Sequence, residues 1–137
     1  MSFVLDSSVT MAWYFTDEIT PATEDLLERV SETGATVPWL WPLEAANALL
    51  MAERRRRITA IDRREFLELL RALPITLDED GASQVWTKTT QLAERFHLTV
   101  YDAVYLELAD RLKLPLATLD NDLRTAAEGL GVPLLGR

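Results

Sequence analysis

The sequence predicts a three-layer α/β sandwich, in which a parallel sheet of about five strands has helices on both faces. Short apolar runs alternate along the chain with longer stretches in which apolar residues recur at helical spacing. Because helices separate the runs, we expect the strands to pair in parallel through right-handed crossovers. The length of 137 residues is that of one domain, so we expect a single domain over residues 1–137.

Five apolar runs are the predicted strands. Each run is too short for a helix and is bounded by Pro, Gly or Asp, which is typical of a buried strand. The runs cover residues 2–5, 36–40, 74–77, 114–119 and 132–135.

Six segments with helical periodicity lie between these strands. The pattern is clearest between residues 99 and 112, where apolar side chains occupy positions 101, 104, 105, 108 and 112. The last helix is expected to end at Gly129, because glycine commonly follows a helix. The predicted helices cover residues 23–33, 43–57, 62–73, 82–96, 99–112 and 121–128.

The composition restricts the chemistry of the protein. There is no cysteine and only one histidine, which excludes a thiolate zinc site, a cysteine nucleophile and a site built from several histidines. We interpret the single histidine, His97, as an ordinary residue at a helix end. Any bound metal would therefore have oxygen ligands, which favours Mg²⁺ or Mn²⁺.

Charge and hydropathy favour an acidic cytoplasmic protein. The 22 Asp and Glu outnumber the 14 Lys and Arg, giving a formal net charge of −8. This balance argues against charge-driven nucleic-acid binding by the whole surface, although not against binding along one basic strip. No apolar run approaches the roughly 18 residues of a membrane span, and the N-terminal residues lack the basic segment of a signal peptide.

Acidic residues follow the predicted strands or begin the next helices. Asp6 follows the first strand and Asp120 the fourth, with Asp122 two residues further on. Glu44 and Asp102 lie in the first turns of predicted helices. Because the carboxyl ends of parallel strands lie along one edge of the sheet, where the ligand crevice opens, we expect these side chains to gather there.

Each carboxylate also has a simpler interpretation. Asp6 and Asp120 could be helix N-caps, and Glu44 could complement a helix dipole. Asp102 could form a capping box with Thr99. As a group, however, the carboxylates repel: two unit charges about 4 Å apart cost roughly 4 kcal/mol at an effective dielectric of 20. Such a cluster requires protons or a divalent cation, and an Mg²⁺ site with oxygen ligands meets that need.

Metal-assisted phosphodiester hydrolysis is the reaction class that these observations favour. An Mg²⁺ ion held by carboxylates can lower the pKa of a bound water and stabilise charge on a phosphoryl oxygen. The five glycines are scattered, so neither a Walker loop nor a dinucleotide-binding glycine pattern is present.

Four sequence pieces together resemble the PIN-domain ribonucleases, and most closely the VapC-type toxins of bacterial toxin–antitoxin pairs. The pieces come in family order and span nearly the whole chain. They are FVLDSSV around Asp6, PLEAANAL around Glu44, LTVYDAVYLELA around Asp102, and LATLDNDL around Asp120.

The resemblance implies a five-stranded parallel sheet and an Mg²⁺-dependent endoribonuclease, with Mn²⁺ as an expected substitute. It assigns catalysis to Asp6, Glu44, Asp102 and Asp120, with Asp6 and Asp102 as the most direct metal ligands. Asp120 and Asp122 are further metal-binding positions.

The resemblance also implies supporting residues and partners. Ser7, Asn47 and Thr118 match polar positions near the acidic site. The implied partners are the RNA substrate, a second copy of the chain in a homodimer, and a cognate VapB-type antitoxin that plugs the site, often with an arginine.

Two further features have competing interpretations. The run Arg54, Arg55, Arg56 and Arg57 is interpreted first as a solvated helix end and second as a weak RNA-binding strip. The four tryptophans are expected to be buried, although one beside the crevice could stack on an unpaired base. The tryptophans are Trp13, Trp39, Trp41 and Trp86.

Two alternative functions remain beside the ribonuclease. One is a catalytically silent PIN-like module that only binds. The other is a receiver-type signalling domain, in which Asp78 would accept a phosphoryl group. A receiver also needs a lysine after its last strand, and the only lysines, Lys88 and Lys113, lie elsewhere.

Overall fold

A computed structural model describes residues 2–15 and 17–137, and it confirms the predicted α/β class. Five parallel strands form one sheet in the order β3-β2-β1-β4-β5. Each strand coincides with a predicted apolar run, although most are shorter. The strands are β1 (Val4–Leu5), β2 (Ala35–Pro38), β3 (Ile75–Asp78), β4 (Leu116–Ala117) and β5 (Leu134–Leu135).

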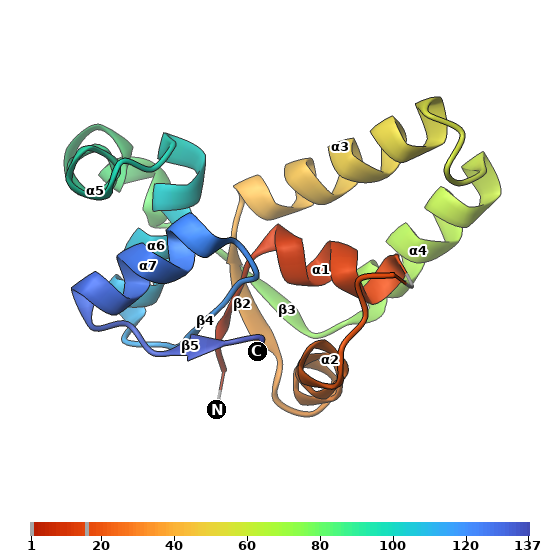
Figure 1. Ribbon diagram of the computed structural model, residues 1–137, viewed down its shortest axis with the longest axis horizontal. Helices are drawn as coiled ribbons and strands as arrows, with labels where there is room; N and C mark the ends of the chain where they lie inside the picture. Colours follow the sequence, from red (N-terminus) through yellow and green to blue (C-terminus); the bar gives the residue numbers. More distant parts are fainter. Residues whose placement is uncertain (1, 16) are drawn as a thin grey trace.

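The helices form two layers around the sheet (Figure 1). The first layer holds the helices before β3, and the second layer holds the helices after it. Right-handed crossovers require this arrangement, because the chain adds strands in one direction up to β3 and in the opposite direction after it. The first layer contains α1 (Ser7–Tyr14), α2 (Pro21–Thr33), α3 (Leu40–Arg54) and α4 (Ala60–Ala72). The second contains α5 (Thr90–Phe96), α6 (Val100–Leu112) and α7 (Asn121–Leu130).

Local capping explains several helix starts. Thr20 and Thr23 form a reciprocal capping box at α2, and Thr59 and Asp62 form another at α4. Two helix ends that differ from the prediction also have a local cause. α3 begins three residues before the predicted residue 43, so Pro42 lies in its first turn, where the missing N–H costs nothing.

The last helix continues past the expected stop at Gly129. A Cβ on Gly129 would lie 2.9 Å from the Phe96 ring, so glycine is there for close packing. The helix ends at Gly131, whose φ of +83° is the left-handed conformation that suits glycine.

The predicted helix over residues 82–96 is wrong in its first half. The chain forms a 3₁₀ turn, η1 (Gly81–Gln84), and a π turn, η2 (Val85–Thr89), before α5 begins. A π turn contains one residue more per turn than an α-helix, so it changes which side chains face the core. Trp86 is accordingly 92% exposed.

Buried aliphatic and aromatic side chains fill both sides of the sheet. The fully buried side chains include Phe3, Leu5, Leu49, Tyr105 and Leu106. Burial of the tryptophans was predicted correctly for Trp41 and wrongly for Trp39 and Trp86, while Trp13 is partly buried. Trp39 lies on the surface because it precedes α3 at the edge of the sheet.

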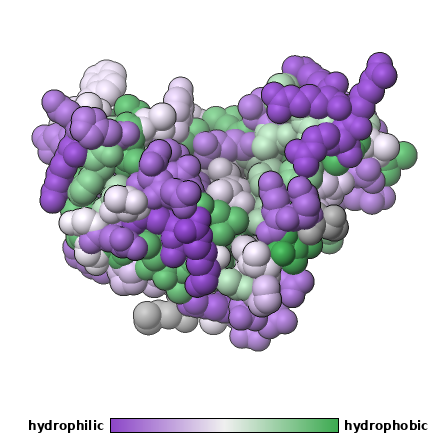
Figure 2. All heavy atoms as spheres, in the orientation of Figure 1, coloured by the Kyte–Doolittle hydropathy of each residue, from purple (hydrophilic) through white to green (hydrophobic). Residues whose placement is uncertain are grey.

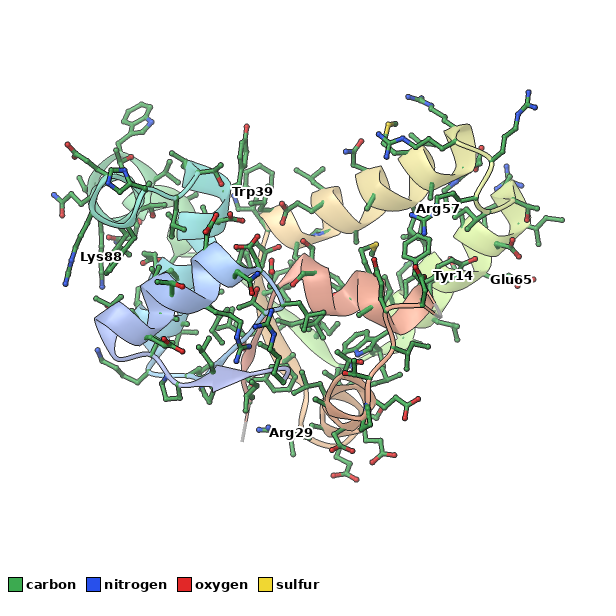
Figure 3. The ribbon with its side chains drawn as sticks, viewed as in Figure 1. Tyr14, Arg29, Trp39, Arg57, Glu65 and Lys88 are labelled. Atoms are coloured by element: carbon green, nitrogen blue, oxygen red, sulfur yellow. The ribbon has the colours of Figure 1, made fainter. Side chains whose placement is uncertain are left out.

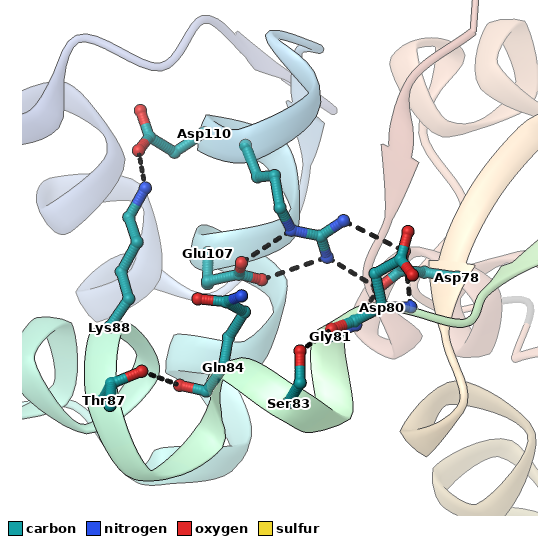
Figure 4. A network of polar contacts seen from close by, with 10 residues as sticks. Asp78, Asp80, Gly81, Ser83, Gln84, Thr87, Lys88, Glu107 and Asp110 are labelled. Atoms are coloured by element: carbon teal, nitrogen blue, oxygen red, sulfur yellow. Dashed lines mark hydrogen bonds and ion pairs between the residues drawn. The ribbon is translucent and has the colours of Figure 1, made fainter.

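An ion-pair network fastens the η1–η2 segment to α6 (Figure 4). Arg111 donates to Glu107 at 2.7 Å and to Asp78, at the end of β3, at 2.7 Å. Glu107 is 1% exposed, so Arg111 provides the cation that its burial requires. Burial alone would raise the pKa of Asp78, but Arg111 and two backbone N–H groups hold that pKa below its usual range. Lys88 makes a second link, to Asp110, at 2.5 Å.

The arginine run lies at the turn between α3 and α4. Arg54 to Arg57 are all exposed, and hydrophilic residues cover this tip in Figure 2. The Arg57 guanidinium lies over the Phe15 ring, 4.4 Å from its centroid. Across the described parts of the chain, no helix combines the length and apolar character needed to cross a membrane.

Candidate active site at the carboxyl edge of the sheet

The order of the sheet reverses between β1 and β4. From β1 the chain continues to β2 and β3 on one side, and it returns to place β4 on the other side. The helices that follow these strands, α1 and α7, therefore cover opposite faces of the sheet (Figure 1). Such a switch point leaves a crevice at the carboxyl ends of the strands. Asp6 immediately follows β1, and Asp120 follows β4 by three residues.

Asp6 is buried at this switch point. It is 4% exposed, and its backbone N–H donates to the Ala117 carbonyl at 3.0 Å. Its Oδ2 accepts hydrogen bonds from Ser8 at 2.7 Å and from Thr118 at 2.8 Å. Burial raises the pKa of Asp6, and the charge of Asp120 adds to the rise, while the two hydroxyl groups oppose it.

The Ser8 and Thr118 hydroxyls also bind the backbone after β4. Ser8 Oγ accepts from the Leu119 N–H at 3.0 Å, and Thr118 Oγ1 accepts from the Asp120 N–H at 3.1 Å. Each hydroxyl therefore donates to Asp6 and accepts from the neighbouring loop. Thr118 lies where the sequence predicts a supporting residue, whereas the role of Ser8 was missed. The one sequence signal for this role is that Ser8 lies two residues after Asp6, because a Ser or Thr close to an Asp often forms a local hydrogen bond.

Glu44, in the second turn of α3, is held by hydroxyl groups from two other elements. Tyr105 donates to its Oε1 at 2.5 Å, and Ser7 donates to the same oxygen at 3.4 Å. Burial raises the pKa of Glu44 and the charge of Asp6 adds to this, while the Tyr105 hydrogen bond opposes it. Burial, together with the charges of Asp6 and Glu44, also raises the Tyr105 pKa, so the phenol stays protonated and remains a donor.

Asp102 lies close enough to the other acids for their charges to act on it. It lies in the first turn of α6, where the Thr99 hydroxyl accepts its backbone N–H at 3.1 Å. Its pKa is raised to about 6, first by burial and then by the charges of Asp120, Asp6 and Glu44. The structure therefore brings four of the predicted acids close enough to affect one another.

The simple capping interpretations hold in part. Asp120 is a helix N-cap, because its Oδ1 accepts from the Leu123 N–H at 2.9 Å. The Thr99 hydroxyl caps α6 by accepting from the Asp102 N–H, which is one of the two hydrogen bonds of the expected capping box. Asp6 occupies the N-cap position of α1 but makes no capping hydrogen bond with its side chain.

Two predicted site residues lie at the margin of the cluster. Asn47 and Asp122 are both exposed. The charges that raise the pKa of Asp102 do not include Asp122, which lies in the first turn of α7. Among the residues that the structure describes, neither side chain makes a hydrogen bond to Asp6, Glu44, Asp102 or Asp120.

The donor set suits a hard divalent cation. It consists of carboxylate oxygens with hydroxyl groups behind them, the chemistry that Mg²⁺ and Mn²⁺ prefer. The distances between these side chains, however, do not yet match a metal site. Within residues 2–15 and 17–137, no three acidic or histidine side chains lie close enough together to hold a metal ion. Burial is the first cause of the raised pKa of Asp6, Glu44 and Asp102, and the charge of at least one neighbouring carboxylate adds to it in each case. The residues therefore fit an Mg²⁺ or Mn²⁺ ion in chemistry.

Comparison with known families identifies this arrangement. The model of the PIN domain family matches residues 3–129, which is most of the chain. This chain belongs to the PIN domain family.

Individual PIN relatives are similar along the whole length. Ribonuclease VapC3 of Pyrobaculum aerophilum is 29% identical over 133 residues, covering 97% of this chain and 100% of the relative. The crystal structure of PAE2754 from the same organism has a TM-score of 0.71 at 24% identity, and the match covers 98% of this chain and 83% of PAE2754. These similarities confirm the PIN-like fold and the resemblance to VapC-type proteins.

Two further solved structures are also similar. VapBC2 from Rickettsia felis, bound to a DNA fragment from its promoter, has a TM-score of 0.67 at 9% identity, covering 98% of this chain and 97% of that chain. FitAcB from Neisseria gonorrhoeae has a TM-score of 0.67 at 13% identity, covering 98% and 96%. At these identities the likeness shows the shared PIN fold.

Proposed function

We propose that this PIN-domain protein is a metal-dependent endoribonuclease and the toxin of a VapBC-type toxin–antitoxin pair. The observation that supports this most is the electrostatic coupling of Asp102 to Asp120, Asp6 and Glu44 at the switch point of the sheet. Carboxylates whose charges raise the pKa of a neighbouring Asp102 cost stability in the free protein, which favours a functional role for the cluster. The name of the relative Ribonuclease VapC3 supports RNA as the substrate.

Asp6, Asp102 and Asp120 would hold the metal ion, with Asp122 as a peripheral ligand. A bound Mg²⁺ or Mn²⁺ supplies a Lewis acid that offsets negative charge on the phosphodiester and acidifies water. Glu44 completes the catalytic acids, and its carboxylate would also help to hold the ion. Ser8, Thr118 and Tyr105 hold Asp6 and Glu44 in place through hydrogen bonds.

A receiver-type signalling domain is disfavoured by the ion pairs. Asp78, its required phosphoryl acceptor, is already paired with Arg111. Both lysines pair with Asp110, Lys88 at 2.5 Å and Lys113 at 3.6 Å. A PIN-like module that binds without cleaving remains the second candidate, because the same acids could hold a cation without turnover.

The antitoxin has a suitable docking surface in an apolar groove between α1, α2 and α4. The groove encloses about 510 Å³ and is lined by apolar side chains such as Trp13, Phe66 and Leu69. Asp62 and Glu65 also line it, and Figure 3 shows Tyr14 and Glu65 along this side of the molecule. An apolar groove with acidic residues suits an amphipathic helix with basic flanks, which is the chemistry we assign to the antitoxin segment.

The homodimer has a separate surface, which we call the Trp39 cleft. It encloses about 250 Å³ between the start of α3, η1 and the start of α6, and Figure 3 shows Trp39 at this place. Trp39, Leu43 and Tyr101 are each more than half exposed there. Asp78 is the one charged side chain in the lining, and Arg111 neutralises it. An uncharged apolar surface can pack against a copy of itself around a two-fold axis.

Cleavage of total cellular RNA by purified, antitoxin-free protein tests the proposed function. The reaction is run with Mn²⁺, with Mg²⁺ and with chelator, beside the Asp102→Asn variant. Metal-dependent cleavage that the variant loses would support the ribonuclease. A folded protein that cuts in none of these reactions would favour the binding module instead.

A further inference from the structure

A buried tyrosine connects the two faces of the acidic site. Tyr105 is fully buried in α6, and its hydroxyl donates to Glu44 Oε1 at 2.5 Å across 61 residues of sequence. α6 and α3 cover opposite faces of the sheet, so this hydrogen bond crosses the carboxyl edge beside the crevice. A buried phenol requires a polar partner, and in this protein that partner is a site carboxylate.

The position of Tyr105 on its helix relates it to a second acid. Asp102 lies three residues earlier on α6, so the two side chains lie on neighbouring turns of one face. Through Tyr105, α6 therefore holds Glu44 at a fixed place relative to Asp102. Ser7 is the other donor to Glu44, but at 3.4 Å its hydrogen bond is at the weak limit.

The hydrogen bonds made by the described residues leave one Glu44 oxygen available. Both donors use Oε1, and neither Tyr105 nor Ser7 reaches Oε2. A carboxylate anchored through one oxygen keeps the other for a cation or water, in a fixed direction. Loss of a hydrogen-bond donor to a carboxylate in a metal site typically lowers metal affinity or activity by 10- to 100-fold.

We propose that Tyr105 is a positioning residue of the acidic site, which fixes Glu44 relative to Asp102 through its buried hydroxyl. This inference rests on the proposed metal-dependent function. It assigns Tyr105 a role in the acidic site, whereas the helical spacing of this residue in the sequence predicts only a place in the core. Tyr105 does not contact substrate in this account and acts through Glu44 alone.

The Tyr105→Phe variant tests the inference, because it removes the hydroxyl and keeps the ring in the core. We expect Mn²⁺ affinity, measured by calorimetry, to fall about 10-fold and the cleavage rate to fall by 10-fold or more. Thr10→Val is the matched control, since Thr10 is also fully buried and its hydroxyl accepts from Trp41 at 2.9 Å rather than donating to a site carboxylate. The control should lose stability without losing Mn²⁺ affinity.

A double-mutant comparison separates positioning from general damage to the core. In a Glu44→Gln background, Tyr105→Phe should have no further effect on Mn²⁺ affinity, whereas a merely structural role would lower it again. Wild-type affinity in Tyr105→Phe would overturn the inference. Because calorimetry needs no turnover, it tests Tyr105 even if the protein proves not to cleave RNA.

A second variant keeps the test decisive if Tyr105→Phe does not fold. Glu44→Asp keeps the charge but shortens the side chain by one methylene, which moves the carboxylate away from the Tyr105 hydroxyl. Glu44 is only half-buried, so we expect this variant to fold. We expect it to lose Mn²⁺ affinity about as strongly as Glu44→Gln. Near-wild-type affinity in Glu44→Asp would refute the positioning role.

Discussion

Asp6 and Thr118 are 112 residues apart in sequence, and the Thr118 hydroxyl donates to Asp6 Oδ2 at 2.8 Å. The contact exists because β1 and β4 are neighbours, with Leu5 paired to Ala117. The residues that follow the two strands thus meet at the switch point. Through this contact and that of Ser8, the sheet itself orients the most buried acid of the site.

Removing the hydroxyls behind Asp6 should weaken cation binding. We expect Thr118→Val to lower Mn²⁺ affinity about 10-fold, because outer-shell partners of metal ligands commonly contribute this much. Titration calorimetry measures the change. Thr125→Val is the matched control, since the Thr125 hydroxyl donates only to the Asn121 carbonyl within α7. Equal affinities for the two variants would contradict the role given to Thr118.

Neutralising Asp102 should stabilise the metal-free protein. The pKa of Asp102 is raised to about 6 in the folded protein, above the ordinary aspartate pKa of about 3.9, so charging this carboxyl costs folding free energy. The cost is absent below pH about 4, where both states are protonated, and complete above pH about 6. In chelator, Asp102→Asn should therefore unfold a few degrees higher than wild type at pH 7.5, with the difference vanishing near pH 4. A lower unfolding temperature at pH 7.5 would argue against the acidic cluster.

The Arg111 network should contribute strongly to stability. Arg111→Ala leaves Glu107 buried without its cation, and we expect a loss of about 3 kcal/mol in the free energy of unfolding. Arg71→Ala is the control, because the Arg71–Glu68 pair is exposed and should contribute less than about 1 kcal/mol. Urea denaturation distinguishes the two variants.

The Arg111 network should also give a defined pH dependence. The pKa of Asp78 is lowered in the folded state, so its stabilising contribution is present above the unfolded pKa of about 3.9. This contribution is lost as the pH falls through the lower folded pKa. The difference between wild type and Arg111→Ala should therefore narrow in strong acid, and a difference that widened there would be inconsistent with the Asp78 pairing.

The arginine run should be a solvated helix end. Arg54, Arg55 and Arg56 lie at the C-terminus of α3 and just beyond it, where cations suit the helix dipole. We expect the triple change to Gln to leave RNA affinity and its salt dependence unchanged in filter-binding measurements. A shallower salt dependence in the variant would instead identify an RNA-binding strip.

The elements that sequence could predict are those with a strong local pattern. The five strands are buried apolar runs, and α6 has an uninterrupted helical period. α1 was not predicted, because eight residues give too few turns to show a period and SSVTMAWY carries β-branched residues. The π turn before α5 was also missed, since no residue type marks a change in helical pitch.

The residues of the candidate site also differ in how well the sequence could predict them. The acids were predictable because each follows a strand or lies within the first two turns of a helix. Ser8 and Tyr105 were not, because their hydrogen bonds depend on elements distant in sequence. Tyr105 is instructive, since its ring fits the apolar stripe of α6 and only its hydroxyl belongs to the site. The exposure of Trp39 likewise follows from its place at the carboxyl edge of the folded sheet, which the pattern of neighbouring residues does not indicate.

The account depends most on the four carboxylates acting as one divalent-cation site. Calorimetric titration of Mn²⁺ into the wild type, Asp102→Asn and Glu24→Gln tests this directly. Glu24 is an exposed carboxylate on α2 and serves as the control for a simple loss of charge. We predict saturable binding to the wild type and to Glu24→Gln, with at least 10-fold weaker binding to Asp102→Asn. Equal Mn²⁺ binding by all three proteins, or no binding by the wild type, would contradict the account.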